Sequence, residues 1–138
     1  MIEVTQVWER LYVGARNDAE RLYSSNPHGI TSVVSLCEDK VLRRNPSVNY
    51  LHIPLRDAMP VGVGQFDAII DAIAENIRWG IVLLHCTAGV SRSPIMIAGW
   101  MHVCGYKNVD AALLEIKKLR PIVSPSPVLL KSVKGHLK

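Results

Sequence analysis

The chain has 138 residues, of which 49% are hydrophobic and 20% charged, a length and balance typical of one globular domain. No apolar run reaches the roughly 18 residues that a membrane-spanning helix needs, and the N-terminus lacks the basic and apolar regions of a signal peptide. The three cysteines, Cys37, Cys86 and Cys104, show neither the even number of a disulfide framework nor a metal-binding spacing. We therefore expect a single domain over residues 1–138, without metal, cofactor or membrane contact, in the reducing setting of the cytoplasm.

The net charge of +4 is concentrated in residues 107–138, which hold seven Lys or Arg and two Asp or Glu. Such a stretch can steer anionic partners, but it is more typical of the solvated faces of two surface helices. No aromatic residues alternate with the basic ones, so we expect no nucleic-acid partner. The absence of a heptad or an apolar surface stripe favours a monomer.

The first half of the chain is predicted to hold mostly strands. In chain order, the expected elements are strands over 4–8 and 11–13, a helix over 17–25 capped by Asn17, a turn over 26–29, a strand over 30–36, a loop over 38–47 and a strand over 48–53. The run over 30–36 is apolar and β-branched, as in a buried strand. Pro54 ends the strand that precedes it.

The second half is predicted to be mostly helical. One apolar face at helical spacing joins Phe66, Ile69, Ile70, Ile73, Ala74 and Ile77. Gly80 is expected to terminate this helix, and the apolar run over 81–84 is typical of a central strand. Further helices are expected over 94–104, ended by Gly105, over 109–119, with Leu113, Ile116 and Leu119 inward, and from a Ser126 cap onward. Alternating strands and helices predict an α/β fold with a central, mostly parallel sheet flanked by helices.

The central strand runs into a tight loop and then a buried helix, an arrangement that binds phosphate. The loop N–H groups and the helix N-terminus direct donors and positive dipole at an anion. A cysteine at the start of such a loop, Cys86, is favoured as thiolate and becomes a nucleophile. Arg92, six residues later, can hold two phosphate oxygens with its planar fork. Ala88 and Gly89 are small enough to let the backbone curl, and Ser93 can donate a hydrogen bond to the sulfur.

An alkoxide or phenoxide leaving group needs a proton, so a carboxylic acid is expected at the mouth of the same site. Asp57 follows the strand over 48–53 and is the favoured candidate. Glu38 and Asp39 are weaker candidates. Asp67 is expected to lie in the first turn of its helix, where its charge suits the dipole.

The segment from His85 to Pro94, with the sequence HCTAGVSRSP, resembles the signature loop of the dual-specificity subgroup of protein tyrosine phosphatases. Residues 11–14, 29–34, 53–57 and 120–127 resemble further parts of this family. The resemblance implies a metal-independent reaction in two steps, in which Cys86 forms a phosphocysteine and Asp57 acts as acid and then as base. It also implies that His85 supports the thiolate, and that Arg92 and the backbone N–H groups of Thr87, Ala88, Gly89, Val90 and Ser91 hold the phosphate.

The implied substrates are proteins carrying phosphotyrosine and phosphoserine or phosphothreonine, because the chain lacks the recognition insertions of the larger tyrosine-specific enzymes. Hydrolysis of an inositol phosphate or an RNA 5′-phosphate is an alternative, although no Lys or His lies within residues 87–91. A catalytically silent phosphoprotein-binding module is another. The chain departs from the family at Pro125-Ser126, where Pro-Asn is frequent, and the Ser126 hydroxyl is expected to replace the usual support of the loop.

Cys37 ends the predicted strand over 30–36, so it is expected near the rim that carries Cys86. A reactive thiolate is prone to oxidation, and a neighbouring thiol can capture it as a disulfide. The sequence thus raises a redox role for Cys37, although a buried core cysteine is the simpler interpretation. Cys104, at the far end of the buried helix, is a poor partner for Cys86.

Overall fold

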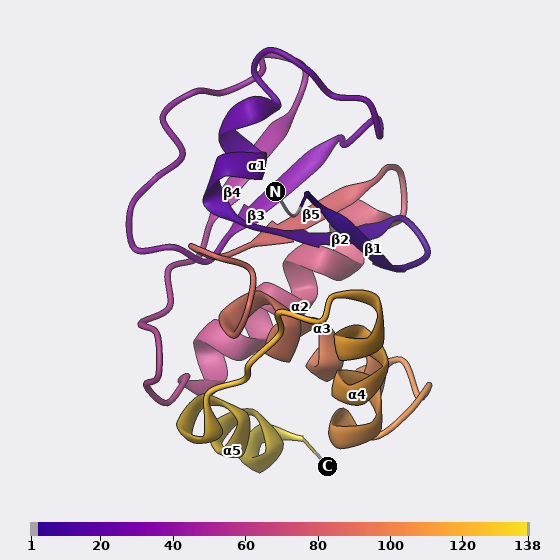
Figure 1. The fold of residues 1–138 in the computed structure, drawn as a ribbon. Coiled ribbons are helices and arrows are strands. Elements are labelled where there is room, and N and C mark those ends of the chain that lie inside the picture. The colour runs from indigo at the N-terminus through magenta and orange to yellow at the C-terminus, as the bar shows by residue number, and fades with distance from the viewer. Residues whose placement is uncertain (1–2, 138) are drawn as a thin grey trace.

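The computed structural model describes residues 3–137 and confirms the predicted α/β fold (Figure 1). Its sheet has the strand order β1-β2-β5-β3-β4. The strands are β1 (Thr5–Trp8), β2 (Leu11–Gly14), β3 (Ser32–Ser35), β4 (Asn49–His52) and β5 (Val82–His85). Only the β1–β2 pair is antiparallel, so the carboxyl ends of β2, β5, β3 and β4 meet at one edge. Ligands bind beyond that edge in sheets of this kind.

Helices cover both faces of the sheet, as Figure 1 shows. The helix α1 (Arg16–Arg21) lies on one face, and the helices α2 (Val63–Ile77), α3 (Arg92–Val103), α4 (Val109–Leu119) and α5 (Pro127–His136) lie on the other. The sidedness follows from two apolar clusters, one joining α1 to Leu83 and the other joining the remaining helices to Leu84. Every residue of β5 is buried because both faces of this central strand are covered.

The predicted helix over 17–25 is wrong in its start and its length. The helix α1 begins at Arg16, with Ala15 at the N-cap, and ends at Arg21. The Asp18 carboxylate, not the Asn17 side chain, satisfies the free backbone there by accepting from Ala15 N at 2.8 Å. An acid at the third helical position can thus replace the usual cap residue.

The helix α2 starts at Val63, three residues before the predicted apolar face, and ends near Arg78. Gly80 does not act as the left-handed terminator that the sequence suggests, because the described glycines with positive φ are Gly29, Gly89 and Gly105. A Cβ on Gly80 would lie 1.9 Å from Thr31 Oγ1. The residue is small because Thr31, which bonds both the N–H and the carbonyl of Ile81, passes close to it.

The ends of the last three helices largely follow the prediction. Gly105 ends α3 with a φ of 75°, and the Tyr106 N–H returns to the Met101 carbonyl at 3.0 Å. The hydroxyl of Ser126 caps α5 by accepting from Leu129 N. In α4, however, Leu119 is 52% exposed, because the helix turns it away from the core.

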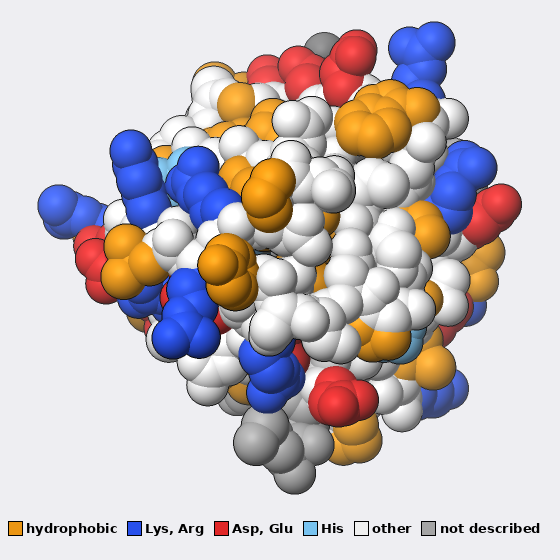
Figure 2. Space-filling model, turned by 90° about the horizontal axis from the view of Figure 1, so that it is seen from above, with side chains coloured by type: hydrophobic (Ala, Val, Ile, Leu, Met, Phe, Trp, Pro, Cys, Tyr) orange, Lys and Arg blue, Asp and Glu red, His pale blue; other side chains and the backbone are white. Residues whose placement is uncertain are grey.

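The sequence led us to expect that the basic residues of the C-terminal third are solvated, but this is wrong for one of them. Arg120 is only 1% exposed, whereas Lys117, Lys118, Lys131 and Lys134 are exposed; Lys138 lies outside the described residues. Figure 2 shows the face on the other side of the molecule, where most of the visible Lys and Arg side chains lie toward the left, with Asp and Glu side chains beside some of them. Within residues 3–137, no helix combines the length and the apolar character needed to span a membrane.

Candidate active site

The candidate site lies where β5 ends and α3 begins. His85 is the last residue of β5, and the signature loop, residues 86–91, leads into Arg92 at the first turn of α3. Because β2, β3 and β4 run parallel to β5, the segments that follow them reach the same edge. Cys37 follows β3 and Asp57 follows β4, as the sequence predicts.

The carbonyl groups of the signature loop are all engaged by the surrounding protein. The Cys86 carbonyl accepts from His85 Nδ1, the Thr87 carbonyl from Arg16 N, and the Ala88 and Gly89 carbonyls from the Arg120 side chain. The Val90 carbonyl accepts from Ser124 N and the Ser91 carbonyl from Ile95 N, and all six distances lie within 2.7–3.4 Å. In contrast, the N–H groups of residues 87–91 donate to no other residue of the described chain. The loop therefore presents a run of free backbone donors next to a helix N-terminus, which is the requirement for holding an oxyanion.

Gly89 is required at its position in this loop for two reasons. Its φ of 69° lies in the left-handed region that side chains rarely adopt. A Cβ there would also lie 2.6 Å from the Gly14 carbonyl oxygen and 2.8 Å from Arg120 Nη2. The loop can approach β2 and Arg120 this closely only with glycine at residue 89.

Cys86 lies at the base of the loop, and its side chain has one hydrogen-bond partner among the described residues. Its Sγ is 3.1 Å from Ser93 Oγ, and both residues are buried, with Cys86 2% exposed. Ser93 lies in the first turn of α3, so its hydroxyl comes from the helix end that faces the loop. A hydroxyl at this distance can donate to a thiolate and stabilise it.

His85 is fully buried beneath Cys86 and is held at both ring nitrogens. Its Nδ1 is 3.3 Å from the Cys86 carbonyl, which can only accept, so Nδ1 carries the proton. Its Nε2 is 2.7 Å from Ser35 Oγ and accepts from that hydroxyl. Burial lowers the pKa of His85 to about 4, so the ring is neutral near pH 7. A neutral, buried ring with both nitrogens engaged ties the backbone of Cys86 to Ser35 of β3.

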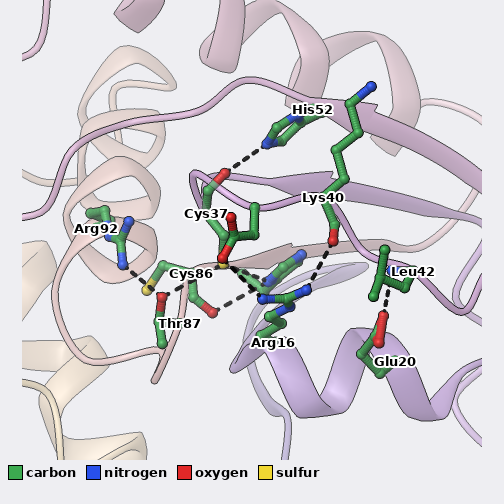
Figure 3. A network of polar contacts seen from close by, with 11 residues as sticks. Arg16, Glu20, Cys37, Lys40, Leu42, His52, Cys86, Thr87 and Arg92 are labelled. Atoms are coloured by element: carbon green, nitrogen blue, oxygen red, sulfur yellow. Dashed lines mark hydrogen bonds and ion pairs between the residues drawn. The ribbon is translucent and has the colours of Figure 1, made fainter.

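Arg92 is 6% exposed and is oriented by two neutral groups. Its Nη1 donates to the Leu55 carbonyl at 3.0 Å, and its Nη2 donates to Thr87 Oγ1 at 2.9 Å. Leu55 belongs to the acid loop, residues 53–60, so this contact joins the signature loop to the segment that carries Asp57. Figure 3 shows Arg92, Thr87 and Cys86 together at this point.

Asp57 is exposed in a turn and is not joined to Cys86 or Arg92 by any contact between described residues. The next residue, Ala58, has a φ of 58°, so the turn has an unusual backbone. Beside it lies a cavity of about 490 Å³, lined by Glu38, Pro54, Leu55, Arg56, Met59, Pro60 and Gln65. The acid loop thus borders open space in which a substrate or the loop itself can be accommodated. Asp67 is exposed, but the expectation that it lies in the first turn of its helix is wrong, because α2 begins at Val63 and Asp67 is its fifth residue.

Arg120 is a residue of the site that the sequence analysis missed. Its Nε donates to Gly89 O at 3.0 Å, and its Nη1 donates to Glu3 O and Thr5 Oγ1 at 2.7 and 2.9 Å. Burial lowers the pKa of the Arg120 guanidinium, and the Asp18 carboxylate opposes that shift. The one feature of the sequence that could have singled out Arg120 is its position directly before Pro121, outside the helical pattern over 109–119.

The expectation that the Ser126 hydroxyl supports the signature loop is wrong, because the backbone of Ser126 provides that support. The Ser126 hydroxyl caps α5, and the backbone N–H of the same residue donates to Ser91 Oγ at 2.9 Å. A backbone donor at this position supports the loop whatever the side chain, which explains how serine can stand where asparagine is frequent.

Cys37 lies among the groups of the site, whereas Cys104 does not. Cys37 Sγ is 3.8 Å from Thr87 Oγ1 and 3.7 Å from His85 Nδ1, and the residue is 2% exposed (Figure 3). Burial raises the pKa of the Cys37 thiol, and the neighbouring Cys86 adds to that shift. Cys104 is exposed at the opposite end of α3.

The chain matches known proteins along nearly its whole length. Residues 11–136 match the family model of the dual specificity phosphatase catalytic domain. Human dual specificity protein phosphatase 14 is 28% identical over 130 residues, covering 89% of this chain and 63% of the relative, so the chain spans less than two thirds of that protein.

Solved structures share the fold. The crystal structure of DUSP15 superposes with a TM-score of 0.86 at 27% identity, covering 96% of this chain and 86% of that one. The structure of PTPMT1 in complex with PI(5)P has a TM-score of 0.79 at 19% identity, covering 96% and 93%, and is alike in fold alone. Together with the loop that starts at Cys86, the family match establishes that this chain belongs to the dual specificity phosphatase family.

Proposed function

We propose that this chain is a metal-independent phosphatase that uses Cys86 as nucleophile and hydrolyses phosphate esters of tyrosine, serine and threonine in proteins. The observation that carries the proposal is the state of the signature loop. Its carbonyls are bound by groups outside the loop, and the N–H groups of residues 87–91, which follow Cys86 directly, donate to no other described residue. Such a loop favours both a thiolate and a phosphate dianion.

In the first step, the Cys86 thiolate attacks phosphorus, the S–P bond forms and the P–O bond to the leaving group breaks. Asp57 gives its proton to the leaving oxygen. Arg92 and the N–H groups of residues 87–91 hold the equatorial oxygens as charge builds on them. Support for Arg92 in this role is its place beside the loop, with both Nη atoms fixed by neutral acceptors.

In the second step, the Asp57 carboxylate takes a proton from water, whose oxygen attacks phosphorus as the S–P bond breaks. The thiolate leaves with the Ser93 hydroxyl 3.1 Å away to stabilise it. His85 holds the backbone of Cys86 from below in both steps. The exposed position of Asp57 requires the acid loop to approach the bound substrate, and the adjoining cavity leaves room for that movement.

The decisive test is phosphate release from a small aryl phosphate in EDTA, with the wild type beside Cys86→Ser. Turnover in the wild type alone supports cysteine catalysis without a metal. Rapid quenching of the wild type should also trap phosphate on the peptide that contains Cys86. Equal activity of both proteins would contradict the proposed nucleophile, and silence of both would favour a phosphoprotein-binding module.

Protein substrates are proposed over lipid or RNA phosphates because residues 87–91 contain no Lys or His. A structural neighbour, PTPMT1, is complexed with PI(5)P, so the fold itself accepts a phosphoinositide. Phosphate release should be compared on phosphotyrosine, phosphoserine and phosphothreonine peptides, a phosphoinositide and an RNA 5′-phosphate. Faster release from either non-protein substrate would overturn the protein assignment.

We further propose that residues 1–138 form one catalytic domain that acts as a monomer in the cytoplasm and binds no nucleic acid. The lack of aromatic residues alternating with the basic ones favours this over a nucleic-acid-binding surface. The need of Cys86 for a reduced thiol favours a reducing compartment. Light scattering at micromolar concentration tests the monomer.

A further inference from the structure

The guanidinium of Arg92 is oriented without a carboxylate. Among the described residues, the ion pairs of Arg16, Arg21, Lys107 and Lys134 do not include it. Its two partners are the Leu55 carbonyl and the Thr87 hydroxyl, both neutral. A buried carboxylate would compete with phosphate for the fork, whereas neutral acceptors fix the fork and leave its charge available to an anion.

The two partners are not equivalent. The Leu55 carbonyl belongs to the backbone of the acid loop, so any residue at that position could supply it. The Thr87 hydroxyl belongs to a side chain, and it is the first residue after the nucleophile. Thr87 is itself fixed, because its carbonyl accepts from Arg16 N at 3.0 Å. The contact with Arg92 therefore depends on having a hydroxyl at residue 87.

The hydroxyl can accept from Arg92 only if its own proton points elsewhere. The structure supplies a direction, because Thr87 Oγ1 lies 3.8 Å from Cys37 Sγ and donates to it. This polar chain from Arg92 through Thr87 to Cys37 is visible in Figure 3. The weak sulfur acceptor turns the oxygen lone pair toward Arg92 Nη2 without placing a negative charge beside it.

We propose that Thr87 is a positioning residue whose side-chain hydroxyl orients Arg92 for oxyanion binding. The same hydroxyl donates its own hydrogen bond to Cys37. This role is separate from that of the backbone N–H that residue 87 contributes to the loop. Only its predicted effect on kcat and KM rests on the proposed function of the site. The prediction for binding stands even if the natural substrate is different.

The first measurement is calorimetric binding of tungstate, a tetrahedral oxyanion like phosphate, to wild type, Thr87→Val and Thr87→Ser. Valine keeps the shape and removes the hydroxyl, and serine restores it. A hydrogen bond to a charged group corresponds to roughly 10- to 100-fold in affinity, so Thr87→Val should bind at least about tenfold more weakly. Thr87→Ser should stay within about threefold of wild type, and the melting temperatures of all three should agree.

The second measurement is a double-mutant cycle with Arg92→Lys, which keeps a charge but removes the fork. If Thr87 acts through Arg92, Thr87→Val should change tungstate affinity by less than about twofold in the Arg92→Lys background. The same cycle on kcat and KM for an aryl phosphate should place the loss in kcat. Cys37→Ala should show a smaller loss of the same kind, and it should add little to Thr87→Val.

Each outcome separates this inference from the proposed function. Equal tungstate binding by wild type and Thr87→Val, or fully additive effects with Arg92→Lys, would overturn the inference even if the enzyme turns over. Hydroxyl-dependent tungstate binding without turnover would support the inference and contradict the proposed phosphatase activity. Absence of tungstate binding by the wild type would contradict both.

Discussion

Arg120 Nε donates to the carbonyl oxygen of Gly89 at 3.0 Å, which ties the segment after α4 to the tip of the loop that begins at Cys86. The same guanidinium reaches Glu3 and Thr5, so one buried side chain joins the loop to the N-terminal strand. Four hydrogen bonds from a group that is 1% exposed indicate a structural clamp rather than a surface charge.

Replacing this clamp should damage both stability and activity. We expect Arg120→Met to lower the free energy of unfolding by about 2–4 kcal/mol, because several buried carbonyls lose their donor. Turnover of an aryl phosphate should fall by about tenfold or more as the loop loosens. Urea unfolding and steady-state kinetics measure the two effects.

The matched control for the clamp is Lys118→Met, which makes the same kind of change at an exposed position of α4. It should leave both quantities near the wild-type values. Equal effects of the two substitutions would mean that Arg120 is no more than a solvated cation.

The sequence predicts the part of the site that is local in the chain. The run from residue 81 to Arg92 carries the strand, the loop and the helix start within twelve positions, so its pattern can be read without tertiary structure. The Arg120 contacts join residues 31 and 117 positions apart, and no local pattern reports such a pairing. Gly80 was misread for the same reason, because the limit on its size comes from Thr31, a residue distant in the chain that directly precedes β3. The position of Asp57 relative to Cys86 likewise depends on how the acid loop packs.

His85 should make stability depend on pH. Burial lowers its pKa from 6.5 to about 4, so the unfolded chain binds a proton between these values while the folded chain does not. The stabilisation from the neutral ring is therefore complete above pH 6.5 and declines as the pH falls toward 4, by an amount on the order of 3 kcal/mol. Urea unfolding at pH 4.5 and 7.5 measures the change.

The control is His85→Gln, which should lose much of this pH dependence while being less stable at pH 7.5. His85 should contribute no ionisation to the pH profile of kcat/KM. The profiles of the wild type and of His85→Gln should therefore have the same shape. An unchanged pH slope of stability in the variant would show that other groups cause the acid destabilisation.

Cys37 should form a disulfide with Cys86 under mild oxidation. Peroxide converts the Cys86 thiolate to a sulfenic acid, and the Cys37 thiol then attacks that sulfur, with release of water. Both thiols lie around Thr87 and His85. The raised pKa of the Cys37 thiol slows its own oxidation by peroxide, and its proton leaves with the sulfenic hydroxyl as water when the disulfide forms. Mass spectrometry should find one linked peptide pair, and a thiol reductant should restore activity.

Two variants test the pairing. Cys37→Ser should lose activity irreversibly under the same peroxide exposure, because nothing captures the sulfenic acid. Cys104→Ser should behave as the wild type, since Cys104 is exposed at the other end of α3. Recovery of the Cys37→Ser protein to the wild-type extent would contradict a protective disulfide.

The loss of activity on removing the Asp57 carboxyl group should increase with the basicity of the leaving oxygen. We expect Asp57→Asn to lower kcat by about 100-fold on a phenyl or alkyl phosphate, and by much less on a nitrophenyl phosphate, whose leaving oxygen is stable as an anion. The structure offers two matched controls, the exposed carboxylates Glu38, which lines the adjoining cavity, and Asp67 in α2. Asp67→Asn should leave the series of leaving groups unchanged. If Glu38→Gln shows the leaving-group dependence and Asp57→Asn does not, the proton comes from the loop after β3 rather than from the acid loop after β4.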